Sequence, residues 1–299
     1  MSADEPTPRP ATLRFPAARL RRLRRRRRPR FKGPSFNRMI PNLMTLLGLC
    51  SGLTAMRFAL QGRFGAAVVA VVVAGAIDGL DGRLARLLKA VSRFGAEFDS
   101  LADFCCFGVA PAFILYLWTL QSAGGFGFMP CLMFAVCMAL RLARFNAALD
   151  SAPSAAYGYN FFTGVPAPAG AGLALFPLFA GLEARSQGWT GLYAFLHHPL
   201  FVAPVLIGTA FLLISTLPVW SFKNFKVPAD FVLPLLLGTG LFAALLLADP
   251  WAALATGGVI YLGMLPFSVR SFRRLRREAE IEEDEATPHS PALTQPPAQ

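Results

Sequence analysis

Long apolar runs, each close to the length of a membrane-spanning helix, fill the sequence between two charged ends. The chain has 299 residues, of which 55% are hydrophobic and only 15% charged, and its mean hydropathy is +0.48. A helix needs about 20 apolar residues to cross a bilayer, whereas a soluble domain of this length would need far more polar surface. The pattern therefore predicts an all-α, polytopic transmembrane helix bundle.

We expect about eight spans and three parts along the chain. The predicted spans are Pro41–Leu60, Phe64–Leu87, Phe94–Leu120, Phe126–Phe145, Gly164–Leu182, Leu200–Leu217, Phe231–Ala248 and Trp251–Ser268. Residues 39–269 would form the transmembrane domain. Residues 1–38 are rich in Pro and Arg, and residues 270–299 become acidic and then low in complexity, so both ends are predicted to be disordered tails.

The distribution of basic residues indicates how the bundle is oriented. An even number of spans places both termini on one side, and 13 of the 29 Lys and Arg lie in the first 38 residues. With that side inside, the outer connections hold only Arg63 and Arg185, with Arg57 one turn within the first span. The inner connections carry Arg83, Arg86, Lys89, Arg93, Arg141, Arg144, Lys223 and Lys226. The positive-inside rule therefore predicts that both termini are cytoplasmic.

The basic run Arg21–Arg28 has two interpretations. Such a run can bind nucleic acid, but it can also set membrane topology and contact anionic lipid head groups. Because an integral membrane domain follows at once, we favour anionic membrane lipids as its partner and expect no nucleic acid.

Four aspartates stand out in the apolar sequence, in the pattern D-x-x-D-G-x-x-A-R-x8-G-x-x-x-D-x-x-x-D. They are Asp78, Asp81, Asp99 and Asp103. Ionisable residues at membrane depth are costly and mark functional sites. Spacings of three and four put each pair on one helix face, and the short connection between them makes the two helices antiparallel neighbours. We therefore expect the four carboxylates to meet at the cytoplasmic end of the bundle.

Such a cluster would repel itself unless it bound cations, and all-oxygen ligands suit Mg²⁺ or Mn²⁺. Two ions held by these carboxylates can clamp phosphate oxygens during phosphoryl transfer. Gly82 and Gly95 would let a nucleotide approach the backbone, Ala85 keeps the helix face low, and Arg86 can counter a phosphate. The alternative is an ion relay, or acids paired with nearby arginines. The interleaved glycines and arginine favour a phosphate site.

The segment from Asp78 to Asp103 resembles the signature of the CDP-alcohol phosphotransferase family at all eight defining positions. Other stretches are similar to one branch of it, the membrane-embedded phosphatidylserine synthases. Those stretches are Ile40–Thr45, Asp99–Asp103, Phe107–Pro111, Arg141–Asn146, Phe162–Pro168, Ser215–Pro218 and Ser221–Lys223. Val165 departs from the branch, where leucine is expected. The resemblance implies a six-helix catalytic core, here followed by two C-terminal helices.

The resemblance also implies roles for individual residues. Asp78, Asp81 and Asp99 would bind the metals, and Asp103 would be the general base and share an ion. Gly82, Ala85, Arg86 and Gly95 would line the CDP site, with Thr45 at the diphosphate. The implied reaction moves the phosphatidyl group of CDP-diacylglycerol to the hydroxyl of L-serine and releases CMP, in an enzyme of the bacterial cytoplasmic membrane. Members commonly dimerise, so a homodimer is expected.

The acceptor site is less defined by sequence. Arg141 and Arg144 lie three apart, on one face at the inner end of the fourth span, and could hold the carboxylate of serine or the phosphate of the lipid. The alternative is that they are arginines that set topology at a helix end, and Asn146 is a weaker candidate. Another acceptor, such as glycerol phosphate, inositol phosphate or choline, is the nearest alternative function. A non-catalytic transporter or lipid-binding protein is a more remote one. The chain contains no H-x-K, so the phosphodiesterase motif of the unrelated soluble serine synthases is absent.

Overall fold

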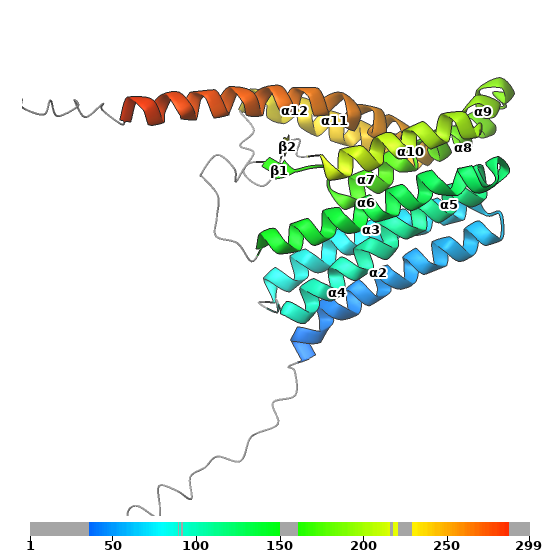
Figure 1. The fold of residues 1–299 in the computed structure, drawn as a ribbon, viewed down its shortest axis with the longest axis horizontal. Helices are drawn as coiled ribbons and strands as arrows, with labels where there is room; N and C mark the ends of the chain where they lie inside the picture. Colours follow the sequence, from blue (N-terminus) through cyan, green and yellow to red (C-terminus); the bar gives the residue numbers. More distant parts are fainter. Residues whose placement is uncertain are drawn as a thin grey trace, which may run out of the picture. The chain divides into compact units, whose positions relative to one another are not determined.

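A computed structural model of the chain describes residues 36–88, 90, 92–149, 161–215, 218–220 and 229–286. Helices dominate these ranges, as predicted (Figure 1). Five of them are long and apolar enough to cross a membrane, and the number rises to seven if each of two bent helix pairs counts as one span. The chain is therefore an all-α integral membrane protein. The basic tail up to residue 35 lies outside the described residues.

The first four predicted spans correspond to continuous helical segments. They are α2 (Phe36–Leu60), α3 (Phe64–Leu87), a composite third span and α6 (Gly125–Leu149). The third span joins α4 (Arg93–Asp103), a π-helical segment η1 (Phe104–Val109) and α5 (Ala110–Trp118), and a 3-10 turn η2 (Leu120–Ala123) follows it. Apolar periodicity does not reveal a π-helix, so this break in regular geometry directly after Asp103 was not predicted.

The fifth and sixth spans are bent. α7 (Ala167–Ala174) and α8 (Phe176–Ser186) meet at 44°, and α9 (Thr190–Leu196) and α10 (Pro199–Ile214) meet at 50°. Pro177 and Pro199 lie in the first turn of the second helix of each pair. Proline lacks the amide hydrogen that would continue the preceding helix, which explains both bends. The predicted sixth span began at Leu200 and missed α9.

Two further helices end the described chain. α11 (Ala229–Ala248) packs against α12 (Pro250–Ala286). The described apolar part of α11, Val232–Ala248, is shorter than the other spans, and with it the apolar segments number the predicted eight. α12 continues to Ala286, although we expected a disordered tail from residue 270. The extension contains no Gly or Pro and is rich in Arg, Glu and Ala, which are strong helix formers. Residues 287–299 lie outside the described ranges.

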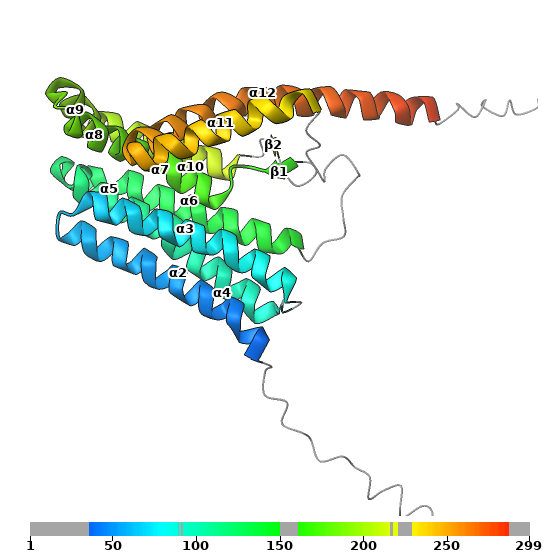
Figure 2. The same ribbon diagram turned by 180° about the vertical axis from the view of Figure 1, so that it is seen from behind.

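A small antiparallel ribbon joins two connections of the bundle. β1 (Phe161–Thr163) pairs with β2 (Pro218–Trp220), with Phe161 opposite Trp220 (Figure 2). Three-residue strands carry too little pattern to be predicted from sequence, and this one was not. The ribbon ties the segment before α7 to the segment after α10.

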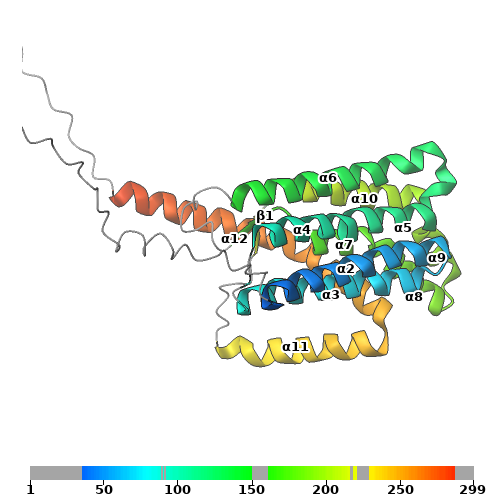
Figure 3. The same ribbon diagram turned by 90° about the horizontal axis from the view of Figure 1, so that it is seen from below.

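Small residues let the first helices approach closely. A side chain at Gly48 would contact Ile77 of α3 at 3.4 Å, and one at Gly52 would collide with Cys106 of η1. A side chain at Gly75 would contact Phe107 at 3.6 Å, whereas Gly79 faces open space. On the other side of the bundle α6 lies beside α10 (Figure 3). Three of these four glycines are therefore helix contacts.

The exposed surface of the bundle is itself apolar. On α3, Ala67, Val68 and Ala74 are buried, whereas Val69 and Val73 on other faces are 52% and 44% exposed. Exposed leucines likewise follow α2 and α11. Lipid tails solvate such side chains as well as a protein interior does, so this surface fits a bilayer.

Candidate active site

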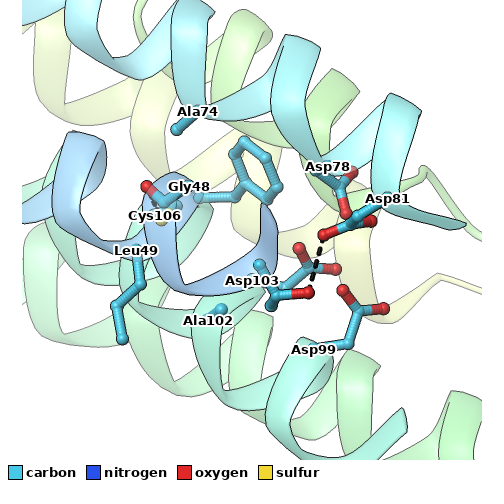
Figure 4. A pocket seen from close by; sticks show the side chains of 11 residues that line it. Gly48, Leu49, Ala74, Asp78, Asp81, Asp99, Ala102, Asp103 and Cys106 are labelled. Carbon is cyan, nitrogen blue, oxygen red and sulfur yellow. Dashed lines mark hydrogen bonds between the residues drawn. The ribbon is translucent and has the colours of Figure 1, made fainter. Parts of the chain in front are cut away.

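The structure brings three of the four predicted aspartates into one cluster. Asp78 projects from α3, and Asp99 and Asp103 project from α4. One carboxylate oxygen from each of the three lies within 4.8 Å of the others. Figure 4 shows these side chains pointing toward one another across the gap between the two helices. The prediction from helical spacing, that carboxylates of the two helices converge, is therefore confirmed for these three aspartates.

The oxygen spacing fits a divalent cation. Oxygens on opposite sides of a Mg²⁺ ion are about 4 Å apart, since each lies at 2.0–2.1 Å from the metal. The three oxygens lie no more than 4.8 Å apart, which is near the largest separation that one ion can bridge, and the ligands are all carboxylates. In a membrane-spanning helix pair, such a cluster is stable only with a compensating charge. Asp78, Asp99 and Asp103 thus form a fitting divalent-cation site.

The fourth aspartate, Asp81, has a different environment. Its carboxylate is almost fully buried, at 3% exposure, and its Oδ2 lies 2.7 Å from the Thr45 hydroxyl. Asp81 lines the same small hollow as the other three acids. The hydrogen bond from Thr45 fixes the Asp81 carboxylate from helix α2. The family resemblance implied that Thr45 lies at the diphosphate. The sequence did not indicate that Thr45 also donates a hydrogen bond to an aspartate.

A larger cavity, of about 1100 Å³ with its open side included, adjoins the acid cluster. It is lined by Pro41, Asn42, Thr45, Asp81, Gly82, Ala85, Arg86, Ala90, Ser92, Gly95, Ala96, Asp99 and Phe145. All five residues predicted to bind the CDP moiety are therefore on its wall. Because Asp99 of the cation site and the neighbouring Asp81 line it too, a phosphate bound here could reach the metal ligands.

The two glycines of the motif differ in what they leave room for. A side chain at Gly82 would meet nothing within 4 Å, so this position opens directly onto the cavity. A side chain at Gly95 would instead lie 2.9 Å from Asn42 Oδ1 and 3.0 Å from Ser92 Oγ. Gly95 therefore lets α2 and the cap of α4 pack closely. Gly95 also lines the cavity, so its place in the CDP site stays a prediction.

Local hydrogen bonds set the rim of the cavity. Ser92 caps α4 by accepting a hydrogen bond from the Gly95 amide at 3.0 Å. Arg86 Nε donates to the carbonyl of Gly82 at 3.1 Å, which lays the guanidinium along its own helix beside the cavity. Sequence reasoning did not assign Asn42, Ser92 or Phe145 to this site. Serine three residues before Gly95 was the signal for the cap.

The three predicted acceptor residues have separate roles. Arg144 donates to the carbonyls of Leu213, Ile214 and Ser215, and so caps the C-terminus of α10. Asn146 Oδ1 accepts a hydrogen bond from Ser100 Oγ at 3.1 Å. The third residue is Arg141. Among the described residues its guanidinium has no hydrogen bond or ion pair, although it interacts electrostatically with Asp103 and Asp78.

An apolar cavity of about 890 Å³ shares Phe107 as a lining residue with the hollow of the acid cluster. Its lining includes Gly75 of α3, Leu173 of α7, Phe242 of α11 and Tyr261 of α12. Phe107 lines both spaces and is itself buried. The bundle therefore offers a polar and an apolar space that share one lining residue.

Comparison with known proteins agrees with this geometry. Residues 38–202 match the family model described as CDP-alcohol phosphatidyltransferase, and residues 230–266 match a second one, CDP-alcohol phosphatidyltransferase 2. A protein of Mycobacterium leprae is 38% identical over 257 residues, 86% of this chain and 83% of its own length. A protein of Mycobacterium bovis is 38% identical over 246 residues, 82% of this chain and 83% of its own.

A more distant relative, from Bacillus subtilis, is 30% identical over 187 residues, 62% of this chain and 91% of its own. All three relatives are named CDP-diacylglycerol–serine O-phosphatidyltransferase. The first family match covers the acid cluster and the adjoining cavity. The second covers α11 and the part of α12 that lines the apolar cavity.

Proposed function

Because this chain belongs to the CDP-alcohol phosphatidyltransferase family, we propose that it transfers the phosphatidyl group of CDP-diacylglycerol to L-serine. The products are phosphatidylserine and CMP. The observation that carries the proposal is the meeting of Asp78, Asp99 and Asp103 beside a cavity walled by Gly82 and Arg86. The names of the relatives support serine as the acceptor.

The metal requirement of the family fits the acid cluster. Asp78, Asp99 and Asp103 would hold the first cation. Asp81, which accepts a hydrogen bond from Thr45, would supply a further ligand for a second cation. We propose Mg²⁺ or Mn²⁺, two ions in all. Bound there, they would neutralise charge that develops on the diphosphate and polarise the phosphorus that is attacked.

The remaining steps belong to the protein side chains. The CDP moiety occupies the 1100 Å³ cavity, where the bare backbone at Gly82 admits it and Arg86 counters a phosphate charge. Asp103 accepts the proton of the serine hydroxyl. The serine oxygen then forms a bond to the phosphorus attached to the lipid, the bond from that phosphorus to CMP breaks, and CMP leaves with the electron pair.

The apolar cavity supports a lipid substrate. Its wall, from Gly75 on α3 to Phe242 on α11, is apolar and lies within membrane-spanning helices. A diacylglycerol group would place its tails there while its diphosphate reaches the acids. The distribution of basic residues supports a cytoplasmic active site in the bacterial inner membrane, with the basic tail on anionic lipids. We also propose a homodimer.

A panel of acceptors tests the proposal. The purified protein would be given CDP-diacylglycerol, Mg²⁺ or Mn²⁺, and serine, glycerol phosphate, inositol phosphate or choline in turn, and CMP would be measured. We expect release with serine alone. Release with another alcohol and none with serine would assign a different acceptor. No release with any acceptor, together with ion flux or lipid transfer, would indicate a non-catalytic protein.

A further inference from the structure

The hydroxyl of Tyr261 is buried on α12 without a hydrogen-bond partner among the described residues. A phenol hydroxyl is a donor as well as an acceptor, and leaving it unpaired in an apolar setting costs free energy. Its ring lines the apolar cavity, and the hydroxyl is the one polar group of this side chain. An orphaned donor at this position suggests that its partner is a bound molecule.

A second donor in the same region also lacks an acceptor. Arg141 on α6 interacts electrostatically with both Tyr261 and Asp103. Its guanidinium makes no hydrogen bond in the part of the chain that the structure describes, and the residue is partly buried. The two donors therefore lie within electrostatic range of each other and of the proposed general base. Neither has a hydrogen-bond acceptor among the described residues.

We propose that Arg141 and Tyr261 together bind the carboxylate of the amino-acid acceptor, an inference that rests on the function proposed above. A carboxylate is an acceptor-only anion with two oxygens. The guanidinium can donate to one or both of them in a charge-assisted bond, and the phenol can donate to another lone pair. This binding would hold the serine hydroxyl on the side of the carboxylate that faces Asp103.

The charges near the site favour a carboxylate over a phosphate. Arg144 donates to the end of α10 and Asn146 accepts from Ser100, so of the three predicted residues Arg141 alone makes no hydrogen bond within the described parts of the chain. One guanidinium balances a single negative charge. A phosphate monoester carries nearly two charges at neutral pH, and four aspartates lie close by. The subsite would therefore select serine against phosphorylated alcohols.

The proposal gives α12 a part in acceptor recognition. Tyr261 lies beyond the motif and the other stretches on which the family resemblance was based, and falls within the second family match. The two C-terminal helices would then complete the acceptor site as well as wall the lipid cavity. Without α12, Arg141 would be the only described donor for the carboxylate.

Tyr261→Phe is the direct test, since it removes one hydroxyl and keeps the ring against the cavity. We expect the KM for serine to rise by about tenfold or more, as for a lost hydrogen bond to a charged group, and the KM for CDP-diacylglycerol to stay within about twofold. Tyr193→Phe is the matched control, because that ring stacks on His197 away from the acids. It should leave both constants unchanged.

Serine methyl ester distinguishes loss of a carboxylate-binding subsite from a general loss of acceptor binding in Tyr261→Phe. Measured as an acceptor or as a competitive inhibitor, the ester, which lacks the carboxylate charge, should bind equally well to the wild type and to Tyr261→Phe. Equal losses of affinity for serine and for the ester would overturn the inference. A raised KM for CDP-diacylglycerol alone would also overturn it. An unchanged KM for serine would do the same while leaving the proposed function intact. A wild type that releases no CMP with serine would contradict both.

Discussion

The hydroxyl oxygen of Thr45 lies 2.7 Å from Oδ2 of Asp81, and this contact links α2 to the acid-bearing helix α3. Thr45 is itself buried, at 7% exposure. The same hydroxyl lies 3.2 Å from the carbonyl of Pro41, so its one proton is shared between two acceptors. A buried carboxylate that depends on one side-chain donor is sensitive to the loss of that donor.

Thr45→Val should therefore weaken metal binding. The substitution keeps the shape and removes the hydroxyl, so Asp81 loses its described side-chain donor. We expect the concentration of Mn²⁺ that gives half-maximal activity to rise by about tenfold, as estimated for a hydrogen bond to a charged group. Thr45→Ser should restore the wild-type value. Thr54→Val, at an exposed position on the same helix, is the control, and an equal effect there would contradict the account.

Asp103→Asn should separate substrate binding from turnover. The amide keeps the size of the side chain but cannot accept the serine proton, so kcat should fall by at least about 100-fold. Binding of CDP-diacylglycerol, measured by calorimetry at saturating Mn²⁺, should persist, because the asparagine oxygen can still bind the cation and residue 103 does not line the nucleotide cavity. Full activity in this variant would rule out Asp103 as the base.

The two motif glycines should respond differently to substitution. Gly82→Val places methyl groups in open cavity space, so we expect a normal thermal midpoint and at least a tenfold higher KM for CDP-diacylglycerol. Gly95→Ala brings a methyl group to within 2.9 Å of Asn42 Oδ1, so the thermal midpoint should fall. Gly79→Ala faces open space outside the cavity and serves as control. A destabilised Gly82 variant with normal KM would reverse these assignments.

Arg144→Ala should act through stability. Its guanidinium donates to three carbonyls at the end of α10, and their loss should cost about 1 to 3 kcal/mol of unfolding free energy. The thermal midpoint of the detergent-solubilised protein should fall, and the KM for serine in the folded fraction should stay near the wild-type value. A raised KM for serine with an unchanged thermal midpoint would instead indicate that Arg144 belongs to the acceptor site.

Sequence alone predicted the parts of this protein that repeat a simple pattern. Span positions followed from apolar length, and the predicted second span, Phe64–Leu87, coincides with α3. The convergence of Asp78 with Asp99 and Asp103 followed from helical spacing and a short connection. Both inferences needed only local geometry.

The rest depends on contacts between distant segments. The sequence offers Arg141 and Arg144 as equivalent partners, and only the packing of α10 beside α6 assigns Arg144 to the carbonyls. Tyr261 is one aromatic residue in an apolar helix until the fold places it near Arg141. The π-helix η1 likewise depends on how the third span packs against its neighbours, which no residue pattern in the segment encodes.

Transfer of labelled serine into lipid tests the central claim most directly. The purified protein would receive CDP-diacylglycerol, isotope-labelled L-serine and Mn²⁺, and label in the lipid phase would be counted against CMP in the aqueous phase. We predict one labelled phosphatidylserine per CMP, and none after chelation of the metal or with Asp99→Asn. Release of CMP without label in the lipid, or transfer that survives both treatments, would contradict the account.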